Sequence, residues 1–313
     1  MTERSDVRPP ATAVAARPAS GLGGLRPILT EMRPRQWAKN LLVVAAPAGA
    51  EVLTELDTWW RLTLAFASFC AASSAIYVLN DLADIEADRR HPTKRNRPLA
   101  AGLISVGTGR VVAAVLAVIA FALAIATTEW DFVAVLAVYV VTTIAYSLWL
   151  KHVAILDLVI VASGFLLRAI GGAVVVNVVV SSWFLIVTGF GSLFVVTGKR
   201  LAELEEMGEE AANVRPTLDH YTVPFLRFVM GVACAGTAVA YCIFSFDKAE
   251  LGGQGAVWFQ LSAIPVVTGL LRYALAVEVG EGATPEDLFL RDRLLQLMGV
   301  IWVVLFGVGL IRA

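Results

Sequence analysis

The sequence predicts an all-α integral membrane protein, and two observations support this class. The mean hydropathy of the 313-residue chain is +0.73, and only 16% of its residues are charged, whereas soluble domains average about 25%. Several stretches of the chain are almost free of charge over about 20 residues, which is the length that a helix needs to cross the hydrocarbon core of a bilayer. A soluble all-α protein is the alternative that these values disfavour.

We expect nine membrane-spanning helices, with most tryptophans near their ends as interface anchors. Residues 1–24 are rich in Ala, Pro, Gly and Arg and are predicted to form a disordered tail. Residues 25–313 are predicted to form one transmembrane domain. The predicted spans are 40–55, 60–82, 106–127, 131–150, 153–176, 182–198, 221–246, 256–277 and 294–311.

Basic residues are concentrated in alternate connections of the chain. They occur in the N-terminal tail, around Arg95 after the second span, at Lys151 after the fourth and at Lys199 after the sixth. Because cytoplasmic loops of membrane proteins carry an excess of Lys and Arg, the N-terminus and these loops are predicted to be cytoplasmic. We therefore expect a multi-pass protein of the cell (plasma) membrane whose functional site faces the cytoplasm.

Several classes of site find no support in the sequence. Cys70, Cys234 and Cys242 lie in apolar runs without C-x-x-C spacing, so no disulfide or zinc framework is indicated. No Gly-rich nucleotide loop is present, and we expect no nucleic-acid partner. A transporter that uses charges for ion coupling would carry them at the bilayer midplane, within repeated halves, whereas the acids here cluster at one membrane face.

The second predicted span ends in an acidic block, NDLADIEAD, which runs from Asn80 to Asp88. If the helix continues through this block, Asn80, Asp84 and Asp88 share one face, with Asp81 at its edge. Like charges repel strongly in a medium of low dielectric, so a cation is expected, and Mg²⁺ prefers such oxygen ligands. The alternative is a solvated acidic helix end, which the position at membrane depth disfavours.

The charge reverses immediately after the acidic block. The Pro-bounded loop HPTKRNRP contains Lys94, Arg95 and Arg97. Carboxylates, a divalent ion and basic side chains together are typical of a diphosphate site, because the metal bridges acids to phosphate oxygens and Lys and Arg neutralise the remaining charge. The alternative is that these residues serve only as a topogenic signal.

The motif N-D-x-x-D-x-x-x-D followed by K-x-x-R-P-L, on the second of nine spans, resembles the UbiA superfamily of intramembrane prenyltransferases. RPRQWAKN before the first span and YSLWLKH after the fourth resemble further motifs of that family. The resemblance extends over nearly the whole chain. It implies a UbiA-type helical bundle that binds Mg²⁺ and a diphosphate substrate.

The sequence departs from the usual prenyltransferase pattern after the sixth span. GKRLAELEE places Lys199 and Arg200 where a second aspartate-rich motif is expected, and only Glu203 nearby is acidic. This feature resembles the branch of actinobacterial decaprenyl-phosphate phosphoribosyltransferases, as do FGSLFVVTGKR and LRDRLLQL. The resemblance implies transfer of 5-phosphoribose from 5-phosphoribosyl 1-diphosphate to polyprenyl phosphate, with release of diphosphate, in the synthesis of arabinan precursors for the cell wall. The alternative is a prenyltransferase that moves a prenyl group from prenyl diphosphate to an aromatic or other acceptor.

This resemblance implies roles for individual residues. Asn80, Asp81, Asp84 and Asp88 are predicted to hold Mg²⁺ on the diphosphate of the sugar. In the alternative version, Asp84 and Asp88 are the metal ligands, and Asn80 and Asp81 position water or ribose hydroxyls. Lys94 and Arg97 are predicted to neutralise the leaving diphosphate.

Five further side chains are candidates for binding the other phosphates or the sugar. The alternative for Lys39 and Lys151 is snorkelling at the interface. The alternative for Lys199 and Arg200 is a topogenic signal, and that for Tyr146 is a place in the aromatic belt. We expect Arg168, well inside the fifth span, to be structural and to meet a partner on another helix.

Membrane lipids are expected to surround the apolar faces, which are also compatible with a homo-oligomer.

Overall fold

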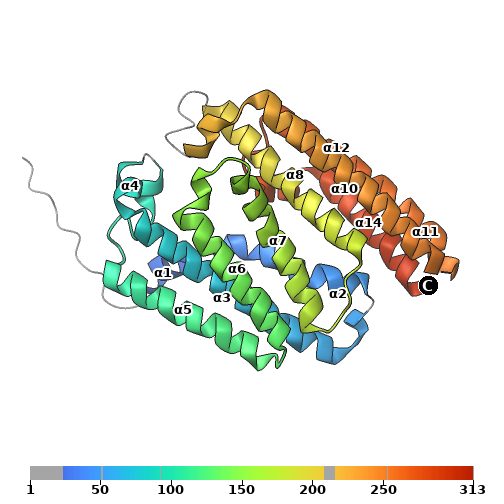
Figure 1. The fold of residues 1–313 in the computed structure, drawn as a ribbon, viewed down its shortest axis with the longest axis horizontal. Coiled ribbons are helices and arrows are strands. Elements are labelled where there is room, and N and C mark those ends of the chain that lie inside the picture. Colours follow the sequence, from blue (N-terminus) through green and yellow to red (C-terminus); the bar gives the residue numbers. More distant parts are fainter. Residues whose placement is uncertain (1–23, 51, 92, 208–215, 252, 313) are drawn as a thin grey trace, which may run out of the picture.

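The computed structural model describes residues 24–50, 52–91, 93–207, 216–251 and 253–312, and all regular elements in these ranges are helical. Most of the predicted N-terminal tail lies outside the described residues. Figure 1 shows the long helices side by side in one bundle. The long helices are α3 (Leu56–Ala83), α5 (Val106–Ala126), α6 (Trp130–Leu148), α7 (Leu156–Val175), α8 (Ser182–Met207), α10 (Val223–Leu251), α12 (Ala263–Glu278) and α14 (Arg293–Arg312).

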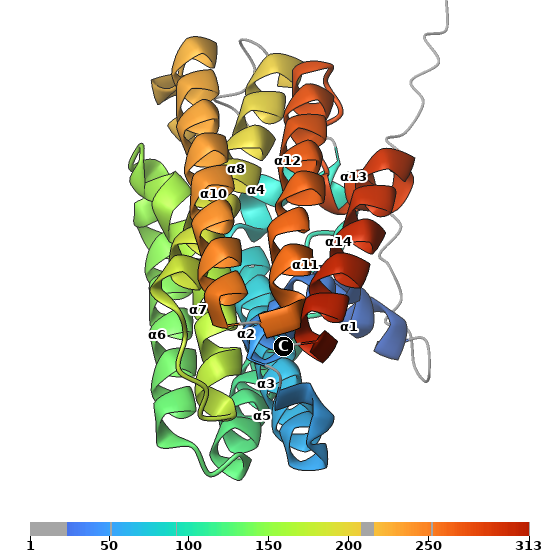
Figure 2. The ribbon, with the colours of Figure 1, turned by 90° about the vertical axis from the view of Figure 1, so that its right-hand side faces the viewer.

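Short helices connect or flank the long ones. In Figure 2, α4 and α13 lie toward the same end of the bundle. The short α-helices are α1 (Leu25–Glu31), α2 (Ala45–Gly49), α4 (Ile85–Arg90), α11 (Ala256–Leu261) and α13 (Pro285–Arg291). The 3₁₀ helices are η2 (Pro34–Val44), η3 (Val52–Thr54), η4 (Lys94–Asn96), η5 (Leu150–His152), η7 (Pro216–His220) and η8 (Gly253–Gly255).

Eight helical segments of the described chain are long and apolar enough to cross a membrane, with α11 and α12 together forming one of them. The predicted span 40–55 is not among these eight segments. Residues 34–49 form η2 followed by the short α2 instead of one long α-helix. Polar residues at the start of this segment and Pro47, which lacks an amide hydrogen, disfavour a continuous apolar α-helix there. The count of nine spans stays a prediction.

Large apolar side chains cover the outside of the bundle. Val118, Val141, Leu271 and Val303 are each at least 60% exposed on four different long helices. A soluble monomer rarely exposes an apolar surface of this extent, whereas lipid would cover it. The exposed surface therefore agrees with the membrane class that the sequence predicts.

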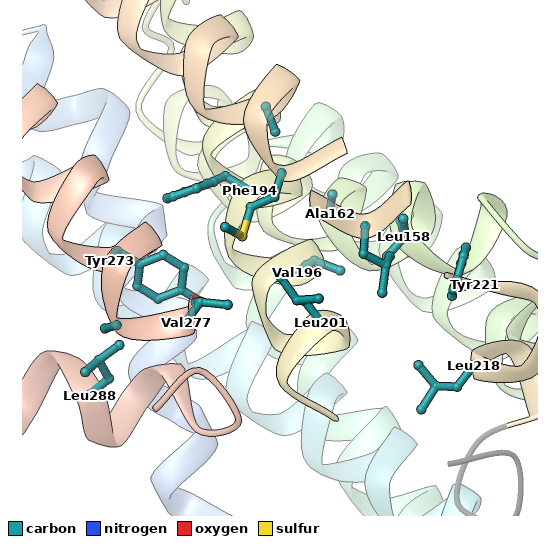
Figure 3. Close-up of a cluster of buried hydrophobic side chains, with 14 of the residues drawn as sticks. Leu158, Ala162, Phe194, Val196, Leu201, Leu218, Tyr221, Tyr273, Val277 and Leu288 are labelled. Atoms are coloured by element: carbon teal, nitrogen blue, oxygen red, sulfur yellow. The ribbon is translucent and has the colours of Figure 1, made fainter. Parts of the chain in front are cut away.

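The bundle has two main apolar cores, which meet where α7 packs against α8. The first core joins α3, α5, α6 and α7 around Phe69 and Phe132. The second joins α7, α8, α10 and α12, and Figure 3 shows Phe194 and Tyr273 among its side chains. The polar clusters described below lie near the ends of helices that contribute to these cores.

The 3₁₀ helix η2 is held tightly against α7 and α3. A Cβ atom at Gly172 of α7 would overlap the backbone carbonyl of Val43, so only glycine permits this approach. The indole nitrogen of Trp37 donates to Ser74 of α3 at 3.0 Å. Because η2 carries Lys39, this packing also fixes where the Lys39 ammonium lies.

Candidate functional site

The acidic block does not continue α3 as a straight helix. α3 ends at Ala83, and Asp84 has the non-helical angles φ −96° and ψ 8° before α4 begins. The amide of Asp88 still donates to the carbonyl of Asp84 at 2.8 Å, so the chain bends without unwinding. The expectation of an uninterrupted helix through Asp88 is therefore wrong, and the block divides into two sets of contacts.

Asp81 and Asp88 are brought together by Arg97. One guanidinium nitrogen of Arg97 donates to Asp81 at 3.0 Å and to Asp88 at 2.7 Å. Arg33 donates to both carboxylate oxygens of Asp81, at 2.7 and 2.5 Å. We call Arg33, Asp81, Asp88 and Arg97 the open cluster, because the two arginine side chains are each 30% exposed whereas the two carboxylates are nearly buried.

Arg33 was not singled out by the sequence reasoning, although it begins the RPRQWAKN motif. Its backbone has the left-handed angles φ 54° and ψ 60° immediately before Pro34, a conformation that is uncommon for a residue other than glycine. Its guanidinium lies 4.9 Å from the centre of the Tyr77 ring, in addition to its bonds with Asp81. Such backbone strain persists only where surrounding contacts stabilise it, and it is frequent at functional sites.

The remaining residues of the acidic block and its basic loop lie beside the open cluster. Asp84 faces Lys151 at 3.6 Å, and their side chains are 45% and 30% exposed. Asn80 and Lys94 are half-buried. The backbone amide of Lys94 donates to a ring nitrogen of His91 at 3.3 Å, which fixes the turn that carries this lysine.

These carboxylate and amide oxygens are suitable ligands for Mg²⁺ in chemical type. Within the described ranges, however, no three His, Cys, Asp or Glu side chains come close enough to form a metal site. Arg97 neutralises Asp81 and Asp88, and Lys151 neutralises Asp84. The predicted ligands Asn80, Asp84 and Asp88 thus fit the metal by type, while basic side chains balance the carboxylates in this structure.

Glu31 is a second residue that the sequence reasoning missed. It is 2% exposed, and its carboxyl group lies beside Asp81 and the backbone of Leu99. Burial, and then the neighbouring Asp81, raise the pKa of Glu31 to about 8. No signal in the sequence marked this single acid, because its burial depends on the packing of α1 against residues distant in the chain.

A second group of charges surrounds Asp157, at the start of α7. The Tyr146 hydroxyl donates to Asp157 at 2.7 Å, and two guanidinium nitrogens of Arg200 donate to it at 2.9 and 3.3 Å. Arg200 also donates to Glu203 at 3.1 Å. We call these four residues the sealed cluster, because the side chains of Arg200 and Asp157 are only 4% and 0% exposed.

Two side chains that were predicted to contact substrate, Tyr146 and Arg200, bind Asp157 in the sealed cluster. Their polar groups are thereby directed toward a protein carboxylate. Asp157 was not among the residues that the sequence marked as candidates. Asp157 and Arg200 lie on different helices, and spacing along the chain gives no sign of their contact.

The other two predicted cations, Lys39 and Lys199, both act on Glu286 of α13. Lys39 of η2 forms an ion pair with Glu286 of α13 at 2.5 Å. Lys199 is half-buried on α8, next to Arg200. Although burial alone would raise the pKa of Glu286, its contact with Lys39 and the charge of Lys199 hold that pKa below its usual range. Lys39, Lys199 and Glu286 therefore lie in one electrostatic neighbourhood.

Arg168 has partners on other elements, as predicted. Its guanidinium donates to Asn40 of η2 at 2.7 Å, to the Tyr139 hydroxyl of α6 at 2.8 Å and to the carbonyl of Gly164 at 2.6 Å. These acceptors are all uncharged. Arg168 thus joins α6, α7 and η2 beneath the segment that carries Lys39.

Residues 41–306 match the model of the UbiA prenyltransferase family. The chain belongs to this family. Membership agrees with the resemblance carried by the acidic block and by the motifs around it, and it assigns the all-helical bundle to the UbiA fold.

Curated relatives cover nearly the full chain. A decaprenyl-phosphate phosphoribosyltransferase of Mycobacterium tuberculosis is 39% identical, with 98% of each chain covered. The enzyme of the same name from Mycolicibacterium smegmatis is 39% identical, with 96% of each chain covered. That of Corynebacterium glutamicum is 39% identical over 88% of this chain and 84% of its own.

Solved structures of UbiA proteins share the fold. A UbiA homologue from Archaeoglobus fulgidus, bound to GPP and Mg²⁺, superposes with a TM-score of 0.68 at 18% identity and covers 91% of this chain and 99% of its own. A structure described as digeranylgeranylglyceryl phosphate synthase has a TM-score of 0.59 at 18% identity and covers 93% of this chain and 100% of its own. At these identities the comparison concerns the fold alone.

Proposed function

We propose that this UbiA-family protein transfers 5-phosphoribose from 5-phosphoribosyl 1-diphosphate to decaprenyl or another polyprenyl phosphate, with release of diphosphate. The reaction would supply arabinan precursors for the cell wall. The relatives named decaprenyl-phosphate phosphoribosyltransferase support this proposal through identity along nearly the whole chain. The observation in the site that carries it is the presence of Lys199 and Arg200 on α8, at the position where the resemblance to prenyltransferases would place a second aspartate-rich motif.

The donor diphosphate is assigned to the open cluster. Asn80, Asp84 and Asp88 would hold Mg²⁺, which supplies positive charge that stabilises the leaving diphosphate. Arg97, already 30% exposed beside Asp88, would move part of its hydrogen bonding to diphosphate oxygens, and Lys94 would assist it. Asp81 would remain bound to Arg33 and so keep this arginine beside the donor.

The acceptor is a lipid phosphate, which is already ionised at neutral pH. Its oxygen attacks the anomeric carbon as the bond to diphosphate breaks, and no general base is needed. The acceptor phosphate and the 5-phosphate of the donor both require cations, for which Lys39, Lys199 and Lys151 are the available side chains. We assign Arg200 to holding Asp157, because it is nearly buried and already paired.

The proposal also includes the setting of the site. The excess of basic residues in alternate connections supports a cytoplasmic N-terminus and a site that faces the cytoplasm of the cell. The lipid tail of the acceptor would then lie along the apolar exterior of the bundle in the plasma membrane.

Transfer of a prenyl group is the second candidate. It is favoured by one finding, the structural likeness to a UbiA homologue bound to GPP and Mg²⁺. Prenyl transfer would place the diphosphate on the lipid, whereas the proposed reaction places it on the sugar. The two candidates therefore predict different labelled products.

The test uses purified protein with 5-phosphoribosyl 1-diphosphate labelled in the ribose, polyprenyl phosphate and Mg²⁺. We expect a labelled lipid and an equal amount of diphosphate, and neither product with geranyl diphosphate and an aromatic acceptor in their place. Asp84→Asn and Asp88→Asn should abolish turnover. Glu86→Gln is the matched control, because this acid of the same block is 69% exposed and contacts only Arg89 in the described structure. Absence of labelled lipid, or normal turnover in both Asp variants, would refute the proposal.

A further inference from the structure

Glu286 links the two halves of the chain across the candidate site. It lies in the first turn of α13, which connects α12 to α14, and its carboxylate contacts the ammonium of Lys39 on η2 at 2.5 Å. Its position is fixed by neighbours on the same short helix, because Pro285 and Leu288 are buried. Figure 3 shows Leu288 pointing into the second core near Tyr273 and Val277.

The surroundings of Glu286 are cationic. Lys39 and Lys199 both stabilise its ionised form, against the effect of burial. Among the described residues, Glu286 is the carboxylate within ion-pair distance of Lys39. Lys199 is acted on by the charges of both Glu203 and Glu286. Glu286 is therefore the described acid that pairs with Lys39, and it shares the compensation of Lys199 with Glu203.

A carboxylate and a phosphate monoester offer the same chemistry to an ammonium group. Both are anions with oxygen acceptors, and the phosphate carries the greater charge. The side chains of Lys39 and Glu286 are 25% and 29% exposed, so a ligand can reach this pair without unfolding the bundle. By contrast, the pair of Asp157 and Arg200 is closed to solvent.

We propose that Glu286 sets the affinity for a substrate phosphate by occupying Lys39, beside Lys199, until the phosphate monoester displaces it. This inference rests on the proposed function, since it takes the monoester to be either the lipid phosphate or the 5-phosphate of the sugar donor. Binding of the phosphate breaks the ion pair between Lys39 and Glu286, so α13 loses its contact with η2 when the substrate enters. Glu286 is thus a specificity-determining residue that competes with the ligand and has no part in the chemical step.

The test measures equilibrium binding of two probes, farnesyl phosphate and ribose 5-phosphate, to the purified full-length protein in detergent. Glu286→Gln removes the competing charge and keeps the shape of the side chain. We expect Glu286→Gln to bind one of the two probes about tenfold more tightly, equivalent to about 1.4 kcal/mol. The probe that responds identifies which phosphate the two lysines receive.

Matched variants separate competition from a structural effect. Asp287→Asn removes an exposed charge from the next position of α13 and should leave both affinities unchanged. Glu286→Asp keeps the competing charge and should remain close to the wild type. In a Lys39→Ala background, Glu286→Gln should lose most of its effect, because the pair no longer exists.

The transfer assay gives a second readout. Glu286→Gln should lower the KM for the responding substrate and leave kcat within about a factor of two, as expected when only ground-state competition is removed. Unchanged or weaker binding of both probes by Glu286→Gln, including no binding by any form of the protein, would overturn the inference. If farnesyl phosphate or ribose 5-phosphate binds as described but no phosphoribose is transferred, the proposed function fails and the competition stands.

Discussion

The open cluster and the sealed cluster use the same chemical parts in different surroundings. Each contains a nearly buried aspartate bound by arginine, with Asp81 in the first and Asp157 in the second. In the open cluster the arginines are 30% exposed, whereas Arg200 of the sealed cluster is 4% exposed. An exposed guanidinium can exchange a protein carboxylate for a ligand anion, while a buried one cannot do so without leaving Asp157 uncompensated.

Under the proposed function, this difference separates the ligand site from a structural junction. Charge and residue type are nearly equal in the two clusters, so neither property alone identifies the functional one. Access to solvent distinguishes the two clusters, together with the further polar side chains Asn80, Asp84 and Lys94 beside the open cluster. The four predictions below test this distinction.

The largest effect is expected for Asp157→Asn. The substitution leaves the Arg200 guanidinium buried without its main counter-charge, and breaking a buried pair in this way costs about 3–5 kcal/mol of stability. Thermal or denaturant unfolding in detergent would measure it. Asp84→Asn is the control, since its partner Lys151 is partly exposed and the loss should stay below about 1 kcal/mol. Equal losses in the two variants would remove the distinction between sealed and open.

Arg97→Gln should lower activity, and it should also cost some stability, because the nearly buried Asp88 loses the described arginine that balances it. Loss of a cation that stabilises a leaving diphosphate is expected to lower kcat/KM about 10²–10³-fold, while Arg33 continues to hold Asp81. The assay is phosphoribosyl transfer, with unfolding measured alongside. Arg95→Gln, an exposed arginine of the same loop, should retain activity. Unfolding as severe as that of Asp157→Asn, with normal residual turnover, would assign Arg97 to structure.

Glu31, which lies beside Asp81 of the open cluster, should make the stability of the protein depend on pH. Its pKa is about 8 in the folded protein against an ordinary value of 4.5, so the folded state binds more protons than the unfolded state between these values. The contribution of Glu31 to the free energy of unfolding is therefore fully present below pH 4.5 and is lost as the pH rises through about 8. Glu31→Gln stays neutral and should flatten the fall in Tm across this range. An unchanged slope in the variant would show that Glu31 is not the group responsible.

The smallest effect is expected for Arg227→Ala. Arg227 pairs with Glu205 and Glu278, but its side chain is 49% exposed. Water already solvates these charges, so the loss should be about 0–1 kcal/mol in unfolding and absent from the transfer assay. A loss comparable to that of Asp157→Asn would mean that exposure does not govern the value of ion pairs in this protein.

Local patterns were sufficient to predict much of the fold. The charge-free stretches predicted most long helices within a few residues, as with 106–127 for α5 and 294–311 for α14. Hydropathy reports the solvent that a segment meets, and the bilayer imposes a minimum length on it. The segment 40–55 is less regular than predicted, because η2 and the short α2 take the place of one long α-helix. Val43 of this segment packs against Gly172, which lies more than a hundred residues away in the sequence.

The candidate site was predictable in composition and less so in contacts. The acidic block and its basic loop correctly marked Asp81, Asp88 and Arg97 as neighbours, because these residues are close in the sequence. Contacts of Arg33, Glu31 and Glu286 depend on how distant helices meet, and no spacing rule encodes them. The bend at Asp84 was missed because the sequence around it is compatible with a continuous helix.

Arg168 has a consequence that extends beyond its hydrogen bonds. It is 6% exposed, and no described carboxylate lies within ion-pair distance of its guanidinium. A permanent charge that is shielded from mobile ions produces a long-range positive potential, which salt weakens much less than it weakens the field of surface lysines. The scaffold itself would then draw the anionic substrates of the proposed reaction toward the candidate site before any side chain touches them, and this attraction would persist at high ionic strength.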